Sequence, residues 1–158
     1  MPIYMKYDSV LGDATAEGHQ KWIELNSVQW GIGRGISAPT GGVADREASA
    51  PSVSELVVTK ATDVSSPKML NEGLQGEGQD VTIDFCKTDK GKLEVYLTIT
   101  LNNTMVSGHS FSSGGDRPTE SLSLNFTKVE FKNVNMGAAG DTGSPDSVTY
   151  DVALGKVV

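Results

Sequence analysis

Three residues of this 158-residue chain have side chains suited to nucleophilic, acid–base or metal chemistry: His19, His109 and Cys86. Neither histidine has a second histidine or a cysteine at metal-ligand spacing. A cysteine becomes a strong nucleophile only where its surroundings lower its pKa, and Cys86 lies out of phase with Val81 and Ile83 in a strand pattern. We therefore expect two solvated loop histidines and an ordinary strand cysteine. The sequence predicts no catalytic, metal or cofactor site, and replacement of all three residues should leave folding unchanged.

The glycines from Gly31 to Gly35 come nearest to a nucleotide-binding motif. The third glycine of G-x-G-x-x-G would fall on Ile36, and no helical pattern follows. A bend at a strand end explains these glycines better than a dinucleotide site does.

Composition and charge exclude further classes of protein. The formal net charge of −7 argues against nucleic acid as a partner, because phosphate binding needs a positive surface. No apolar run approaches the ~18 residues of a membrane span. The first residues lack the basic and apolar regions of a signal peptide. With a single cysteine, the chain cannot form an internal disulfide.

Alternating apolar residues predict a chain made mainly of strands, with Gly, Val, Thr and Ser recurring throughout. The apolar phase shifts near Asn26 and again near Thr127, which indicates a bulge or a bend between two sheets. Residues 93–101 place their odd-numbered apolar side chains on one face. We expect seven to nine strands in a small β-barrel of two packed antiparallel sheets, with one short flanking α-helix. The strands are expected at residues 3–7, 22–32, 53–60, 81–85, 93–101, 122–131 and 148–152.

The one helix is expected over residues 66–75. Ser66 can cap the first turn, Pro67 suits the first helical position, and Gly76 suits the C-terminal cap. Leu70 and Leu74 share one face at i, i+4, so this face is expected to pack against a sheet.

A long segment over residues 33–52 is rich in Gly, Ala, Ser and Pro. It exceeds the usual loop length of roughly 4–6 residues. Ile36 and Val43 are its only aliphatic side chains larger than alanine, so it contributes little to a core. Such loops are either functional or disordered.

Several segments in a fixed order resemble the haemolysin-coregulated protein family, Hcp. They are residues 22–25, 56–60, 96–101 and 112–130, together with the Ser66-Pro67 helix start. The resemblance runs from about residue 3 to about residue 132, and it is weaker from Asn133 onward.

This resemblance implies a single Hcp-like tube domain over residues 1–158 that is not an enzyme. It implies homohexameric rings that stack into the inner tube of the type VI secretion system, with sheath, spike and baseplate proteins as partners and small effectors in the lumen. The protein would be cytoplasmic before firing and then secreted without a cleaved signal peptide, in virulence or bacterial competition. The 33–52 loop and the turn over residues 88–91 would then make ring or stacking contacts. Candidate contact residues are Ile36, Val43, Asp45, Arg46, Asp89 and Gly91.

Two other classes remain open from the residues themselves. A phage-type tail-tube protein shares the same architecture and ring arrangement. A carbohydrate-binding β-sandwich would present exposed aromatics, whereas Trp22 and Trp30 lie in one structural strand pattern. A hydrolase is disfavoured, because the chain offers no catalytic set.

Overall fold

A computed structural model describes residues 1–38, 40–41, 47–136 and 142–158 of the chain. The strands are β1 (Ile3–Tyr7), β2 (Ile23–Leu25), β3 (Ser27–Gln29), β4 (Ile32–Gly33), β5 (Ile36–Ser37), β6 (Glu47–Ala48), β7 (Ser52–Val53), β8 (Leu56–Ala61), β9 (Gln79–Asp89), β10 (Lys92–Ser112), β11 (Thr119–Asn125), β12 (Lys128–Met136), β13 (Thr142–Asp151) and β14 (Lys156–Val157). One helix, α1 (Ser66–Gln75), lies between β8 and β9. No helix in the described ranges is long and apolar enough to cross a membrane.

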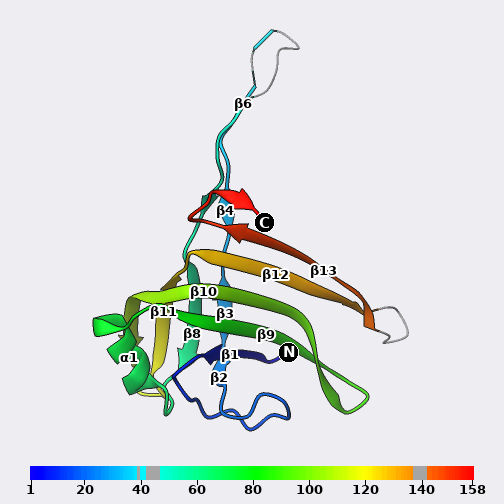
Figure 1. Cartoon of the computed structure of the whole chain (residues 1–158). Coiled ribbons are helices and arrows are strands. Elements are labelled where there is room, and N and C mark those ends of the chain that lie inside the picture. The colour runs from blue at the N-terminus through cyan, green and yellow to red at the C-terminus, as the bar shows by residue number, and fades with distance from the viewer. Residues whose placement is uncertain (39, 42–46, 137–141) are drawn as a thin grey trace.

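The strands form two antiparallel sheets that share β10 (Figure 1). The first sheet has the order β14-β13-β12-β10-β9-β1-β2, and the second has the order β10-β11-β8-β3. Strand β10 is 21 residues long: its first part pairs with β9 and β12, and its last part pairs with β11. The predicted mainly β chain with antiparallel sheets and one short helix is confirmed.

The two predicted phase shifts mark the places where the chain passes between the sheets. β2 pairs with β1, and β3 pairs with β8, with Asn26 as the only residue between them. Phe126 and Thr127 likewise separate β11 in the second sheet from β12 in the first. Among the described strands the pairings branch and do not form a closed cycle.

The main core lies between the inner faces of the two sheets. Its fully buried side chains come from both sheets and from α1, and include Met5, Ile23, Leu56, Val58, Met69, Val81, Ile83, Leu101, Leu122 and Leu124. A smaller cluster of Tyr4, Ala14 and Cys86 lies on the outer face of the first sheet.

The expected single apolar face over residues 93–101 is wrong because of a bulge at Tyr96. The register of β9 and β10 shifts between Val95 and Leu97. Val95 therefore pairs with Cys86 and joins the outer cluster, whereas Leu97 pairs with Phe85 on the inner face. Periodicity alone does not reveal a bulge inside a long run of β-branched and aliphatic residues.

Helix α1 has the predicted bounds, but its cap and its buried face differ from the prediction. Ser65, not Ser66, occupies the N-cap position, and its side chain makes no capping hydrogen bond. Met69 is fully buried, whereas Leu70 and Leu74 are 45% and 76% exposed. The helix is anchored mainly through one methionine, so its leucine face is left without a partner in the described chain.

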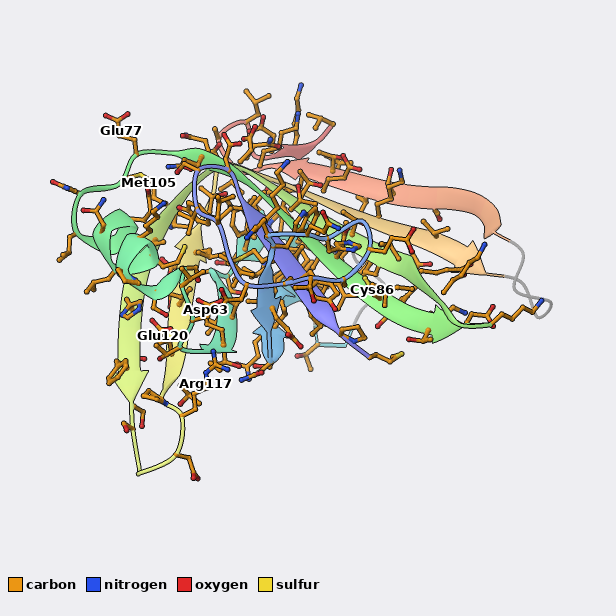
Figure 2. The ribbon with its side chains drawn as sticks, turned by 90° about the horizontal axis from the view of Figure 1, so that it is seen from below. Asp63, Glu77, Cys86, Met105, Arg117 and Glu120 are labelled. Carbon is orange, nitrogen blue, oxygen red and sulfur yellow. The ribbon has the colours of Figure 1, made fainter. Side chains whose placement is uncertain are left out.

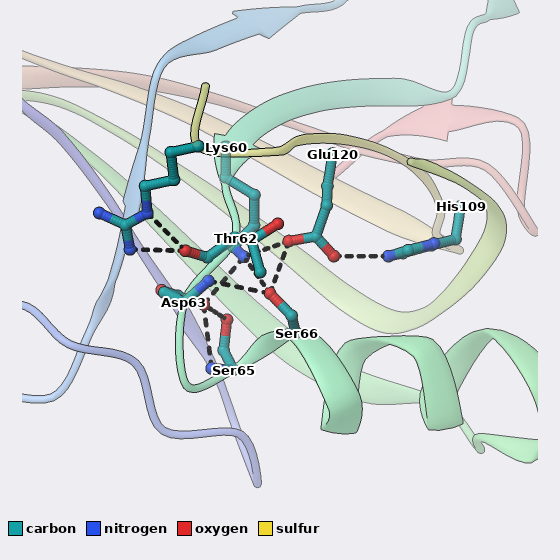
Figure 3. Close-up of polar contacts among 8 residues, drawn as sticks. Lys60, Thr62, Asp63, Ser65, Ser66, His109 and Glu120 are labelled. Atoms are coloured by element: carbon teal, nitrogen blue, oxygen red, sulfur yellow. Dashed lines mark hydrogen bonds and ion pairs between the residues drawn. The ribbon is translucent and has the colours of Figure 1, made fainter. Parts of the chain in front are cut away.

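A buried lysine joins α1 to the second sheet (Figure 3). The Lys60 ammonium on β8 lies 2.9 Å from Glu120 Oε2 and 2.9 Å from Asp63 Oδ1. It also donates to Ser66 Oγ at 3.1 Å. The Lys60 side chain is 0% exposed and that of Glu120 is 2% exposed. Buried charges are stable only when paired and hydrogen-bonded, and these partners come from β11, the turn between β8 and α1, and the start of α1.

Glu120 is the centre of this network. Its Oε2 accepts from Ser66 Oγ at 2.6 Å as well as from Lys60, and its Oε1 lies 2.8 Å from His109 Nε2. Burial alone would raise the pKa of Glu120. The hydrogen bonds from Ser66, Lys60 and His109, with the charge of Lys60, outweigh burial and lower the pKa below its ordinary value of 4.5.

The Glu120→Gln variant should therefore be destabilised by about 3 kcal/mol at pH 7, because it leaves a buried ammonium short of one charged partner. Urea unfolding measures this loss, and Glu17→Gln, at an exposed position, serves as the control. A lowered folded-state pKa gives stability that is present above pH 4.5 and is lost as pH falls through that lower pKa. The difference between wild type and variant should shrink accordingly in acid. A difference that stays constant down to pH 3 would contradict this assignment.

Candidate functional site

His19 is buried, so the prediction of a solvated loop histidine is wrong. It is 6% exposed, its Nε2 lies 2.8 Å from Asp84 Oδ2, and its ring stacks on Tyr4 with centroids 5.0 Å apart. Trp22 meets the same ring edge-on at 4.6 Å. The connection between β1 and β2 folds back over the outer face of the first sheet, and at Gly12 a Cβ would lie only 2.4 Å from the Trp22 carbonyl oxygen.

His109 is also not a solvated loop residue. It lies in β10, its side chain is 12% exposed, and it contacts Glu120 in the Lys60 network. A signal for this network was present in the sequence, because Lys60 and Glu120 continue the inward phase of Leu56 and Leu122 in their strands. Replacement of His19 and His109 removes partners of buried carboxylates, so we expect it to cost stability, contrary to the expectation from sequence.

Cys86 and His19 do not form a nucleophile and base pair. Cys86 Sγ lies 4.0 Å from His19 Nε2, which is the same nitrogen that meets Asp84. A catalytic relay needs the acid on one ring nitrogen and the nucleophile on the other. Burial, and then the charge of Asp84, raise the pKa of the Cys86 thiol to about 11. The described residues also contain no group of three His, Cys, Asp or Glu side chains that could hold a metal ion.

The segment predicted as a long loop is a two-stranded arm that projects from the body (Figure 1). β4 pairs with β7, and β5 pairs with β6. Two serines brace the arm from within: Ser54 Oγ bonds the backbone of Gly31 at 3.0 and 2.8 Å, and Ser49 Oγ bonds that of Gly35 at 3.0 and 3.2 Å. Each serine also donates its backbone N–H to the carbonyl of the same glycine, so its side chain adds to a backbone hydrogen bond between the two sides of the arm.

The predicted contact residues fall on two distinct parts of the molecule. Ile36 lies on β5 of the arm and is 52% exposed. Val43, Asp45 and Arg46 were also predicted in this segment, but they lie outside the described residues. The structure therefore places only Ile36 of this set on the arm.

The other two predicted contact residues lie at the turn between β9 and β10. Asp89 ends β9, and Lys90 and Gly91 have φ values of 51° and 78°. Two successive positive φ values match the right-handed twist of the flanking strands. This turn lies at the end of the first sheet, away from the arm (Figure 1).

The first sheet also presents an open edge. β14 pairs only with Tyr150 and Asp151 of β13. The rest of β13 has no strand on its outer side in the described part of the chain. Beside this edge, Leu154, Val157 and Val158 are 64%, 65% and 54% exposed. An open edge flanked by apolar side chains is typical of a surface that pairs with another chain.

The buried thiol of Cys86 should react slowly with a maleimide or a disulfide reagent at pH 7.5, since it is 0% exposed and its pKa is raised to about 11. We expect full reaction within seconds in 6 M guanidinium chloride, and at least a hundredfold slower reaction in buffer. Because thiol ionisation is disfavoured in the fold, stability should fall as pH rises from 9 towards 11. Fast labelling of the native protein would show that the loop does not cover Cys86. Cys86→Ala, unreactive in both states, is the control.

Comparison with known proteins agrees with this architecture. A family model described as "Type VI secretion system effector, Hcp" matches residues 4–132. The fold is similar to that of a solved type six secretion system protein, with 24% identity, a TM-score of 0.90 and 99% of both chains covered. It is also similar to a type VI secretion system effector from Yersinia pestis, with 24% identity and a TM-score of 0.74 over 95% of this chain and 99% of that one.

Hcp1 from Salmonella typhimurium is a third such structure, with 20% identity and a TM-score of 0.77 over 99% and 98% of the two chains. No curated protein sequence matches the chain. These structural likenesses establish the fold, and the family match covers most of the sequence. The chain therefore belongs to Hcp, the family of type VI secretion system effectors.

Proposed function

We propose that this chain is a structural subunit of the type VI secretion tube, folded as one Hcp-like domain over residues 1–158. Six copies form a closed ring, and rings stack into the expelled tube. The arm is the observation that carries this proposal. An isolated two-stranded ribbon is marginally stable in water, and this one exposes Ile32 and Ile36 at 67% and 52%. A partner surface is needed to hold it.

The open edge of β13 supports the same conclusion. Edge strands with exposed apolar neighbours aggregate unless they are paired or protected. Cyclic symmetry pairs such surfaces between identical neighbours and leaves none free. Within each subunit, the bends at Asn26 and within β10 bring the two sheets together as a barrel.

The arm and the β9–β10 turn are proposed to make the ring and stacking contacts. On the arm, Ile36 is the one proposed contact residue that the structure describes. The other three, Val43, Asp45 and Arg46, follow further along the sequence of the same segment. At the turn, Asp89 and Gly91 lie at the end of the first sheet. A turn and an arm at separate places suit two separate contacts, one within the ring and one between rings.

The proposed role is structural and not enzymatic. Cys86 is held as a neutral thiol, and both histidines are paired with carboxylates that tie strands and loops together. The partners are further copies of this chain, the sheath, spike and baseplate proteins, and small effectors in the lumen. The protein would reside in the cytoplasm and leave the cell with the tube.

Size-exclusion chromatography with light scattering tests ring formation directly. The purified chain should elute at six times its mass of 16.7 kDa at micromolar concentration, and the peak should show closed rings in negative-stain micrographs. A monomeric mass with no rings on the grid would count heavily against the proposal.

Shortening the arm separates its role in assembly from any role in folding. Replacement of residues 38–50 by a short Gly-Ser linker should leave the melting temperature near that of wild type, because loop closure entropy changes by only about 0.6 kcal/mol per doubling of length. The same variant should assemble tubes poorly and fail to support secretion, since a weakened ring contact recurs along the whole stack. An unfolded variant would assign the arm to the core. Normal secretion would show that the contacts lie elsewhere.

A further inference from the structure

The arm has one face that no described residue covers. Ile32, Arg34 and Ile36 are alternate residues of the extended segment that forms one side of the arm, so their side chains point to the same side. All three are exposed, with Ile32 and Ile36 at 67% and 52%. The opposite face of the same segment has glycine at positions 31, 33 and 35. The side chains of this segment therefore form a single apolar strip with one cation at its centre.

Arg34 has no carboxylate partner in the part of the chain that the structure describes. A guanidinium group forms short, charge-assisted hydrogen bonds with a carboxylate, and it sheds water more readily than an ammonium group does. An arginine between two exposed isoleucines therefore suits a surface that offers a carboxylate beside an apolar side chain.

The connection between β1 and β2, residues 8–22, lies at the opposite end of the molecule from the arm. In Figure 1 the arm rises from the top of the body, and this connection closes the bottom in blue. Figure 2, seen from below, shows the same connection in front of the sheets. Rings that stack in one direction bring one end of each copy towards the opposite end of a copy in the next ring.

The β1–β2 connection offers a carboxylate beside an apolar side chain. Burial alternates along its first part, where Val10, Gly12 and Ala14 are buried and Leu11 and Asp13 are exposed. Leu11 is 57% exposed, and no ion pair involves Asp13 within the described ranges. Since the side chains of an extended chain alternate in direction, Leu11 and Asp13 point outward together.

Internal contacts hold the β1–β2 connection in place. Gly12 donates its backbone N–H to the Lys21 carbonyl at 2.8 Å, and Ala14 donates to the Trp22 carbonyl at 3.0 Å. Further along, the buried His19 ties the connection to β9. A surface that is already ordered loses little conformational entropy when a partner binds.

We propose, on the basis of the stacked rings inferred above, that the arm of one copy docks on the β1–β2 connection of a copy in the next ring. Arg34 pairs with Asp13, and Ile36, which lies further out on the arm than Ile32, packs against Leu11. On both surfaces the apolar and the charged residue are two positions apart in an extended chain, a distance of about 6.6 Å.

The charges favour this receiving surface over the β9–β10 turn. The β1–β2 connection carries three carboxylates and one lysine, so it attracts a cation. At the β9–β10 turn, Lys87, Lys90 and Lys92 surround the single carboxylate of Asp89. Like charges across an interface are unfavourable, so Arg34 would be repelled there.

A disulfide tests the contact in the full-length protein. Oxidised rings of Leu11→Cys combined with Ile36→Cys should give a ladder on a non-reducing denaturing gel and ring stacks in negative-stain micrographs. Either single variant should give neither, and Cys86 does not interfere because it is buried. Double-variant rings without a ladder and stacks would overturn the docking, as would loss of rings in this variant alone. Absence of rings in the wild type would instead reject the assembly on which the docking rests.

Charge reversal tests the pair of Arg34 and Asp13 through the rate of the same cross-link in about 0.15 M salt. Arg34→Glu, added to the cysteine variant, should slow the reaction about tenfold, because like charges then face each other. Further addition of Asp13→Arg should restore the rate. Glu17→Arg is the matched control, since Glu17 is an exposed carboxylate of the same connection, and it should leave the rate unchanged. A rate insensitive to Arg34→Glu, or not restored by Asp13→Arg, would refute the pairing.

Discussion

Strand β10 belongs to both sheets, and this sharing is the constraint on which the rest of the structure depends. Its first part lies between β9 and β12, and its last part pairs with β11, so the strand must bend to enclose the core. The bend lies near Asn103, which has a φ of 51°, and Thr104 beside it is fully buried. Because β10 turns one sheet into the other, the inner faces meet and bury Ile99, Leu101 and Val106.

Helix α1 packs against β10 and adds one fully buried methionine, Met69, to the core. A single side chain is a weak anchor for a helix of ten residues. The Lys60 network supplies the rest, because it fixes the start of α1 to β8 and β11 through charged and hydroxyl groups. Buried ion pairs contribute little net stability compared with apolar packing, but they penalise any arrangement that separates their members. The network therefore determines where α1 lies, and hence which of its faces remains open.

The features that we propose to act in assembly lie on the surface. Both histidines and the cysteine instead make contacts inside the described fold. The outside instead carries an arm with exposed isoleucines, an open edge on β13 and two exposed leucines on α1. A monomer with so many unpaired surfaces suits a subunit that is stable mainly in an assembly. This agrees with membership of the Hcp family.

Much of the fold follows from the sequence by itself. Period-two patterns located β1, β9 and the later strands, the phase shifts at Asn26 and Thr127 marked the crossings between sheets, and Ser66 to Gly76 bounded the helix. These features are local, because side-chain alternation and turn residues are set by neighbouring positions. The candidate contact residues on the arm and turn were also chosen from local composition and family resemblance, and they remain predictions.

Only the tertiary structure decided which side chains became buried. His19 was predicted to be solvated, yet the fold closes a loop over it and pairs it with Asp84, 65 positions along the chain. Leu70 and Leu74 were predicted to pack inward, yet α1 is rotated so that Met69 enters the core. A helical pattern of period 3.6 leaves two neighbouring faces nearly equivalent when apolar residues are few. We infer that the contact between Lys60 and Glu120 selects which of these two helix faces is buried. The two residues lie 60 positions apart, so no local sequence pattern reveals their contact.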